Sequence, residues 1–204
     1  MIKYIIFDFD GTIADSFSLA IKCTKEIAKE NHKDFNHLDF KDMKSKTIYE
    51  VIKDDFSISL LELPFYLKKI KKCMIKRYDE VKLFEGIKEV IQKLNKKYKI
   101  IILSSNYKEF IQKVLLKEKL DLEILRSSSL FGKAKTIKRF MKNKNLKDEE
   151  LIYVGDEIRD IESCKKVNIK IISVSWGFNS KDLLIKYKPD YLIKHPKELL
   201  NIIQ

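Results

Sequence analysis

Ile5-Ile6-Phe7-Asp8-Phe9-Asp10-Gly11-Thr12 has the pattern of a buried strand and the turn that ends it. The apolar run leads directly into two carboxylates at positions i and i+2, which point to the same side of an extended chain. Gly11 allows a sharp turn after them. Two acids this close repel each other unless a cation or a shared proton relieves them. The segment alone also fits an ordinary Asp-Gly turn, so the rest of the chain must decide.

Beyond this segment the chain shows two hydrophobic patterns. Residues 16–80, which we call the insertion, show only helical periodicity, over 16–31, 39–44, 47–55 and 64–78, with Ser16 as the expected N-cap of the first helix. The rest alternates between strand and helix. Predicted strands cover residues 2–8, 98–103, 122–125, 150–154, 169–174 and 190–193, and predicted helices cover residues 86–97, 107–118, 134–144, 158–167, 180–187 and 196–203.

This alternation predicts an α/β fold with a doubly wound parallel sheet, Rossmann-like, and helices on both faces. The insertion is far too long to be a loop. We therefore expect a core of residues 1–15 and 81–204 and a separate helical unit of residues 16–80.

The net charge of +12 at first suggests a nucleic-acid partner. Only four of the 42 basic residues are arginine, however, and arginine is the usual residue for bidentate phosphate and base contacts. The lysines are spread along the helices among many isoleucines and asparagines, so we expect no nucleic-acid partner. A basic field would still attract small anionic substrates.

The expected location is the cytoplasm. No apolar run approaches the ~18 residues that span a membrane, and acids interrupt the first apolar stretch, unlike in a signal peptide. The three cysteines, Cys23, Cys73 and Cys164, are odd in number and far apart. We expect them to be unpaired, as in a reducing compartment.

Polar side chains follow three of the predicted strands, and ligands bind at the carboxyl edge of such sheets. Clustered carboxylates there suit Mg²⁺, while a hydroxyl, a lysine and backbone N–H groups suit a phosphoryl group. Each residue alone also fits a helix cap or a surface charge. The residues are Asp8, Asp10, Gly11 and Thr12; Ser104, Ser105 and Asn106; Asp156, Glu157 and Asp160; and Lys133 at the start of a helix.

Four motifs among these residues resemble, in order, those of the haloacid dehalogenase (HAD) superfamily phosphatases. They are Asp8-Phe9-Asp10-Gly11-Thr12, Ser104 after its apolar strand, Lys133, and Gly155-Asp156-Glu157-Ile158-Arg159-Asp160. The insertion is similar to the α-helical cap of this family, and Trp176-Gly177-Phe178 resembles its phosphoglycolate phosphatase branch.

The resemblance implies a Mg²⁺-dependent phosphatase that hydrolyses a small phosphorylated metabolite, such as phosphoglycolate, a sugar phosphate or a nucleotide, through an aspartyl-phosphate. It implies that Asp8 is the nucleophile and that Asp10 is the general acid and base. Mg²⁺ would be held by Asp8, the backbone carbonyl of Asp10 and Asp156, with Glu157 and Asp160 behind these ligands.

The resemblance also assigns the phosphate contacts. Ser104 and Lys133 would bind the transferring phosphoryl group. Gly11, Thr12, Ser105 and Asn106 would complete the cradle. In the polar turn Ser45-Lys46-Thr47 of the insertion, Lys46 would face the cleft and pair with a distal anionic group of the substrate.

Three alternatives remain open. A phosphomutase of the same family would pass the phosphoryl group to a second sugar hydroxyl. A receiver domain also uses a phospho-accepting aspartate, a hydroxyl, a lysine and Mg²⁺, but has no counterpart of the insertion. A nucleic-acid-binding protein could have kept the fold. The sequence determines neither the substrate nor the oligomeric state.

Overall fold

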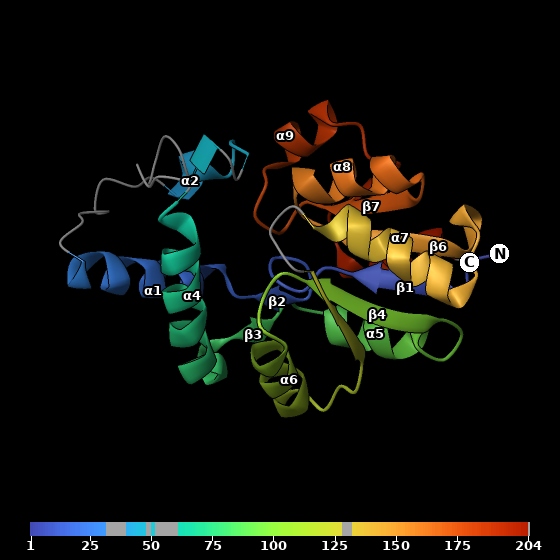
Figure 1. Cartoon of the computed structure of the whole chain (residues 1–204). Coiled ribbons are helices and arrows are strands. Elements are labelled where there is room, and N and C mark those ends of the chain that lie inside the picture. Colours follow the sequence, from blue (N-terminus) through green and yellow to red (C-terminus); the bar gives the residue numbers. More distant parts are fainter. Residues whose placement is uncertain (32–39, 48–49, 52–60, 128–131, 204) are drawn as a thin grey trace.

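The core of the fold is a six-stranded, fully parallel sheet (Figure 1). The computed structural model describes residues 1–31, 40–47, 50–51, 61–127 and 132–203. The strand order β5-β4-β1-β6-β7-β8 places β1 at the centre, with later strands added outward on both sides. The strands are β1 (Tyr4–Phe7), β4 (Lys99–Ser104), β5 (Glu123–Arg126), β6 (Leu151–Gly155), β7 (Lys170–Val174) and β8 (Tyr191–Ile193). This order confirms the predicted doubly wound α/β fold.

Helices cover both faces of the sheet because alternate β1 side chains point to opposite sides. Ile5 and Phe7 pack into one apolar cluster with α5, α6 and α10, while Ile6 packs into a second cluster with α7, α8 and α9. Strands buried on both faces are expected to be continuously apolar, as the central strands β1 and β6 are. The helices are α5 (Ile87–Leu94), α6 (Lys108–Lys117), α7 (Lys133–Lys144), α8 (Ile158–Val167), α9 (Lys181–Lys186) and α10 (Leu199–Ile202).

The insertion lies beyond the carboxyl end of β1 (Figure 1). Its described helices are α1 (Phe17–Glu30), α2 (Phe40–Met43) and α4 (Leu63–Lys76). A two-stranded antiparallel ribbon of β2 (Ala14–Asp15) and β3 (Lys82–Leu83) joins the two points where the chain leaves and rejoins the sheet layer. The sequence did not predict this ribbon, because a two-residue strand shows no periodicity.

The predicted elements of the core all occur, with ends shifted by a few residues. The last predicted helix, residues 196–203, is a 3-10 turn followed by the short α10. Most of the helix predicted for residues 47–55 lies outside the described residues.

The prediction that no cysteine is paired was wrong. Cys23 of α1 and Cys73 of α4 form a disulfide with a Cα–Cα distance of 5.8 Å, and Cys164 is free and buried. The pairing results from the packing of α1 against α4, which brings together residues 50 positions apart. Spacing along the chain carries no information about such a contact. Because two of the three cysteines pair, cysteine usage no longer indicates a reducing compartment.

We expect reduction of Cys23–Cys73 to lower the free energy of unfolding by about 2–4 kcal/mol, because the bond closes a long loop in the unfolded chain. Urea unfolding with and without dithiothreitol measures this difference. A Cys73→Ser variant is the control, since its unfolding should not respond to the reductant. Three reactive thiols in the denatured, unreduced protein would contradict the bond.

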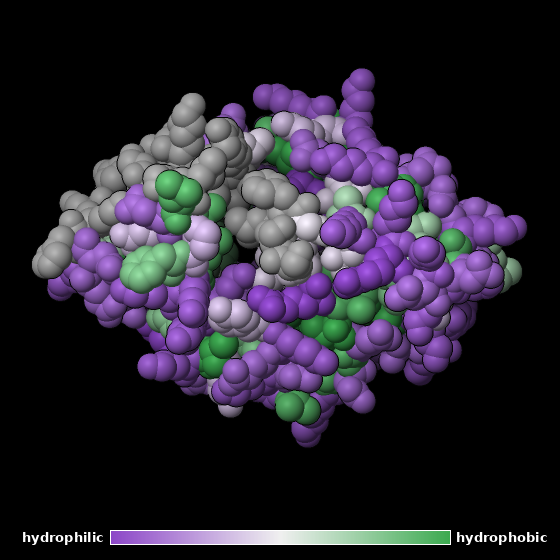
Figure 2. Space-filling model, viewed as in Figure 1, coloured by the Kyte–Doolittle hydropathy of each residue, from purple (hydrophilic) through white to green (hydrophobic). Residues whose placement is uncertain are grey.

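Hydrophilic residues dominate the described part of the surface in Figure 2, with hydrophobic residues only in small groups. This face of the described chain therefore shows no broad apolar patch of the kind that marks a protein interface. Of the helices that the structure describes, none has the length and hydropathy needed to cross a membrane.

Candidate active site

Asp8 lies at the centre of the carboxyl edge of the sheet, directly after β1. Its backbone N–H donates to the carbonyl of Val154 at 2.8 Å, which continues the pairing of β1 with β6. The residue is 2% exposed, and its Oδ1 accepts the N–H of Phe9 at 2.8 Å. The central strand therefore holds this carboxylate rigidly, with Oδ2 left for other partners.

Lys133 is the cation of this buried centre, since its Nζ lies 2.7 Å from Asp8 Oδ2 and 2.5 Å from Asp160 Oδ1. The lysine is 1% exposed, so it is no surface charge. Asp160 is held in turn by the hydroxyl of Tyr153, which donates to Oδ1 at 3.1 Å, and by the N–H of Glu157, which donates to Oδ2 at 3.2 Å. With both oxygens engaged, Asp160 is a support for Lys133.

Asp156 follows β6 and meets the turn after β1. Its Oδ1 accepts the hydroxyl of Thr12 at 2.7 Å, and its Oδ2 accepts the N–H of Phe178 at 2.7 Å. Gly11 has a φ of +77°, and a Cβ there would lie 2.1 Å from Asp156 Oδ2. Only glycine fits at this position, so the turn after β1 packs directly against the Asp156 carboxylate.

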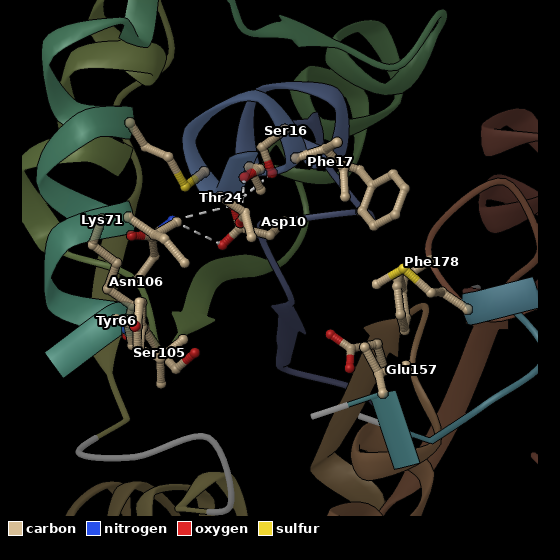
Figure 3. A pocket seen from close by; sticks show the side chains of 18 of the residues that line it. Asp10, Ser16, Phe17, Thr24, Tyr66, Lys71, Ser105, Asn106, Glu157 and Phe178 are labelled. Carbon is tan, nitrogen blue, oxygen red and sulfur yellow. Dashed lines mark hydrogen bonds between the residues drawn. The ribbon is translucent and has the colours of Figure 1, made fainter. Parts of the chain in front are cut away.

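Asp10 is less buried than Asp8 and points toward the insertion (Figure 3). Its carboxylate accepts hydrogen bonds from Ser16 Oγ at 2.6 Å, Ser104 Oγ at 3.2 Å and Asn106 Nδ2 at 3.3 Å. Ser16 precedes α1 as expected, but its side chain makes no cap hydrogen bond. The predicted N-cap position is therefore confirmed, while the Ser16 hydroxyl donates to Asp10 in place of a cap contact.

Among the described buried side chains of this centre, the carboxyl groups outnumber the one ammonium, that of Lys133. Burial raises the pKa of Asp8, an effect that the Lys133 ammonium opposes. Burial and the charge of Glu157 raise the pKa of Asp156 well above its usual range. Burial lowers the pKa of Lys133, but Asp160 and Asp8 more than reverse this, so its pKa is raised on balance.

These carboxylates fit a divalent cation. Asp8, Asp156 and Asp160 each offer an oxygen, and the three oxygens lie within 4.8 Å of one another. A cation beside Asp8 and Asp156 would favour their charged forms, which burial disfavours. Hard oxygen donors of this kind suit Mg²⁺.

The remaining sequence candidates lie around this centre, with one exception. Ser105 and Asn106 line a cavity beside Asp10, and so does Glu157, whose carboxylate pairs with Arg159 at 2.5 Å. Lys46 is absent from the described lining of that cavity. Its ammonium pairs with Asp42 at 2.6 Å, and its backbone carbonyl accepts the side-chain amide of Asn179 at 2.9 Å.

The insertion instead contributes Lys71, which reaches from α4 into the cavity (Figure 3). Its Nζ donates to the carbonyl of Ser105 at 2.5 Å. Burial lowers the pKa of Lys71, whereas the charge of Asp10 raises it. Lys71 is one of several lysines on a helix with a strongly basic surface, so its position could not be read from the sequence.

Sequence reasoning also missed three other supports of the site. Ser16 was assigned to capping, Tyr153 to the sheet core, and Phe178 to a family motif with no contact attached. One signal for Tyr153 was present in the sequence. Tyr153 lies two residues before Gly155, which begins the fourth motif, so both residues point to the same side of β6. No pattern in the sequence indicated that the Phe178 N–H reaches Asp156.

The chain is similar to known proteins over nearly its whole length. It is 24% identical over 204 residues to phosphoglycolate phosphatase of Synechococcus elongatus, covering 98% of this chain and 96% of that protein. It is 24% identical over 213 residues to pyrophosphatase PpaX of Listeria welshimeri, covering 100% of this chain and 97% of that protein.

Solved structures share the fold. A haloacid dehalogenase-like hydrolase family protein from Streptococcus pneumoniae superposes with a TM-score of 0.81 at 23% identity, covering 100% of this chain and 99% of that one. A hydrolase from Pseudomonas syringae superposes with a TM-score of 0.78 at 20% identity, covering 98% and 97% of the two chains.

The model of the haloacid dehalogenase-like hydrolases matches residues 5–174, a span that contains all four motifs. The resemblance drawn from those motifs is therefore confirmed: this chain is an enzyme that belongs to the haloacid dehalogenase-like hydrolase family.

Proposed function

We propose that this protein is a Mg²⁺-dependent phosphatase that hydrolyses a small phosphomonoester through an aspartyl-phosphate on Asp8. The buried Asp8–Lys133–Asp160 arrangement carries the proposal, because it holds one carboxylate oxygen rigidly beside a fixed cation. The names of the relatives, a phosphoglycolate phosphatase and a pyrophosphatase, support the same class of reaction.

In the first step, an oxygen of Asp8 attacks phosphorus, and the bond from phosphorus to the substrate oxygen breaks. Asp10 gives its proton to that departing oxygen. Ser16, Ser104 and Asn106 hold the Asp10 carboxylate on the side of the cavity, where the leaving group would lie. In the second step, Asp10 takes a proton from the water that attacks the aspartyl-phosphate, and phosphate and free Asp8 result.

Lys133 and Ser104 stabilise the negative charge that grows on the phosphoryl oxygens. Gly11, Thr12 and Ser105 complete the cradle around the phosphoryl group. Asp8, Asp156 and the backbone carbonyl of Asp10 would hold Mg²⁺, which offsets the repulsion between the carboxylates and the phosphate. Asp160 lies behind Lys133 and orients it, while Glu157, at the cavity lining, orients Arg159.

Residues 16–80 form a cap over the core of residues 1–15 and 81–204 in this proposal. The insertion touches the loop that follows β7. The N–H of Ser180 donates to the carbonyl of Lys44 at 2.8 Å, and the side-chain amide of Asn179 donates to the carbonyl of Lys46 at 2.9 Å. Such a cap excludes water from the reacting groups. The cytoplasmic location and the absence of a nucleic-acid partner stay predictions.

The test is release of phosphate from p-nitrophenyl phosphate. We expect turnover with Mg²⁺, loss of turnover in excess EDTA, and recovery when Mg²⁺ is added back, because the carboxylates would otherwise repel the phosphate. Release without a partner protein or an acceptor sugar also separates a phosphatase from a receiver domain and from a strict phosphomutase. Full turnover in excess chelator would overturn the metal requirement.

A further inference from the structure

A cavity of about 250 Å³ adjoins Asp10 between the sheet layer and the insertion (Figure 3). Asp10, Ser105 and Asn106 lie at the reaction end of its lining. Helices α1 and α4 supply most of the remaining wall, and Phe178 completes it from the loop after β7. Because the cavity begins at the proposed general acid, the part of the substrate bonded to the departing oxygen must enter it.

The cavity wall is predominantly apolar. Its described apolar members are Phe17, Ala20, Ile21, Met43, Val51, Leu63, Tyr66, Leu67, Ile70, Met74 and Phe178. Ile21 and Leu67 are half-buried and belong to none of the three apolar clusters formed by the described residues. Both side chains line the cavity, where a ligand would contact them.

With Asp10 ionised, the formal charges of the described lining sum to zero. The anions are Asp10 and Glu157, and the cations are Lys71 and Arg159. Arg159 is paired with Glu157, and the Lys71 ammonium donates to the carbonyl of Ser105. While Asp10 is ionised, the described lining thus shows no excess positive charge for a second anionic group on the substrate, and Lys46, which pairs with Asp42, is not part of that described lining.

We infer that the alcohol part of the substrate is an apolar group, alkyl or aryl, which packs against the α1 and α4 side chains of this cavity. The inference rests on the proposed function and specifies its substrate class. A compact substrate with two anionic groups, such as phosphoglycolate, would leave the apolar wall in contact with water and would gain little charge pairing in return. An apolar leaving group removes that wall from water.

The experiment compares kcat/KM for phosphate release from methyl, butyl and hexyl phosphate and from phosphoglycolate, with p-nitrophenyl phosphate as the reference. Burial of a methylene favours binding by roughly fourfold, so butyl phosphate should exceed methyl phosphate by about 60-fold. Butyl or hexyl phosphate should also exceed phosphoglycolate. A flat or falling alkyl series, or a preference for phosphoglycolate, would overturn the inference while leaving the phosphatase in place. No release from any of these substrates would instead overturn the proposed function.

Leu67→Asn tests the wall directly. The ratio of kcat/KM for hexyl phosphate to that for methyl phosphate should fall by about tenfold, because the variant replaces apolar wall by a polar amide. The matched control is Leu116→Asn on α6, where the leucine is 72% exposed, and there the ratio should not change. Ile21→Asn replaces Leu67→Asn if that variant does not fold. An unchanged ratio in a folded wall variant would contradict the inference.

Discussion

Asp8→Asn should reduce turnover of p-nitrophenyl phosphate by about 10⁴-fold or more, the scale for loss of a nucleophile. Asparagine keeps the shape of the side chain and an oxygen that can accept the Phe9 N–H. It removes the negative charge that faces Lys133 and cannot form the acyl phosphate. The variant therefore separates the chemistry of the site from its geometry.

Two further measurements complete the Asp8 test. Acid-quenched wild-type protein should carry phosphate that hydroxylamine releases, and Asp8→Asn should carry none, because only the carboxylate forms an acyl phosphate. Asp182→Asn, an exposed acid on α9, is the control and should turn over like wild type. Near-wild-type turnover by Asp8→Asn would refute the proposed mechanism.

Lys133→Met should lower turnover on the order of 10²-fold or more, the scale for loss of one positioned electrostatic contact. It should also lower the free energy of unfolding by about 3–5 kcal/mol, because it leaves the buried carboxylates of Asp8 and Asp160 facing each other without their cation. Methionine keeps most of the volume of the lysine stem, so no large cavity adds to this loss. Urea unfolding measures the second effect, and the rate per folded molecule measures the first.

Lys138→Ala is the matched control, since Lys138 is exposed on the same helix α7. Both of its effects should be small, as for an isolated surface charge. Equal, small effects at positions 133 and 138 would contradict both the catalytic and the stabilising role of Lys133.

Most of the core could be predicted because its patterns are local. The strand Lys99–Ser104 contains a continuous apolar run from Ile100 to Leu103, and helices such as Ile87–Leu94 have a clear apolar face. Motif residues that follow strands were expected to lie close together, because the carboxyl ends of parallel strands lie at one edge of the sheet. Asp8, Asp156 and Lys133 were therefore predicted as neighbours although up to 148 positions separate them along the chain.

The insertion was harder to predict because its contacts depend on how helices pack. The helical pattern placed Cys23 and Cys73 on different helices, but it could not bring the two sulfurs together. Lys46 was chosen because its polar turn resembled that of a cap, yet its side chain pairs with Asp42. The lysine that the insertion does contribute to the cavity beside Asp10 is Lys71. It could not be predicted, because tertiary packing decides which face of α4 points toward the sheet.

The sequence by itself determined the parallel α/β core, the helical insertion and the four motifs, because periodicity and strand ends depend on neighbouring residues. Only the tertiary structure decided which donors hold Asp10, that Tyr153 and Phe178 brace the carboxylates, that two cysteines pair, and that the wall beside the site is apolar. Each of these contacts joins residues from different elements. Their distances depend on how those elements pack, which no local pattern of residues records.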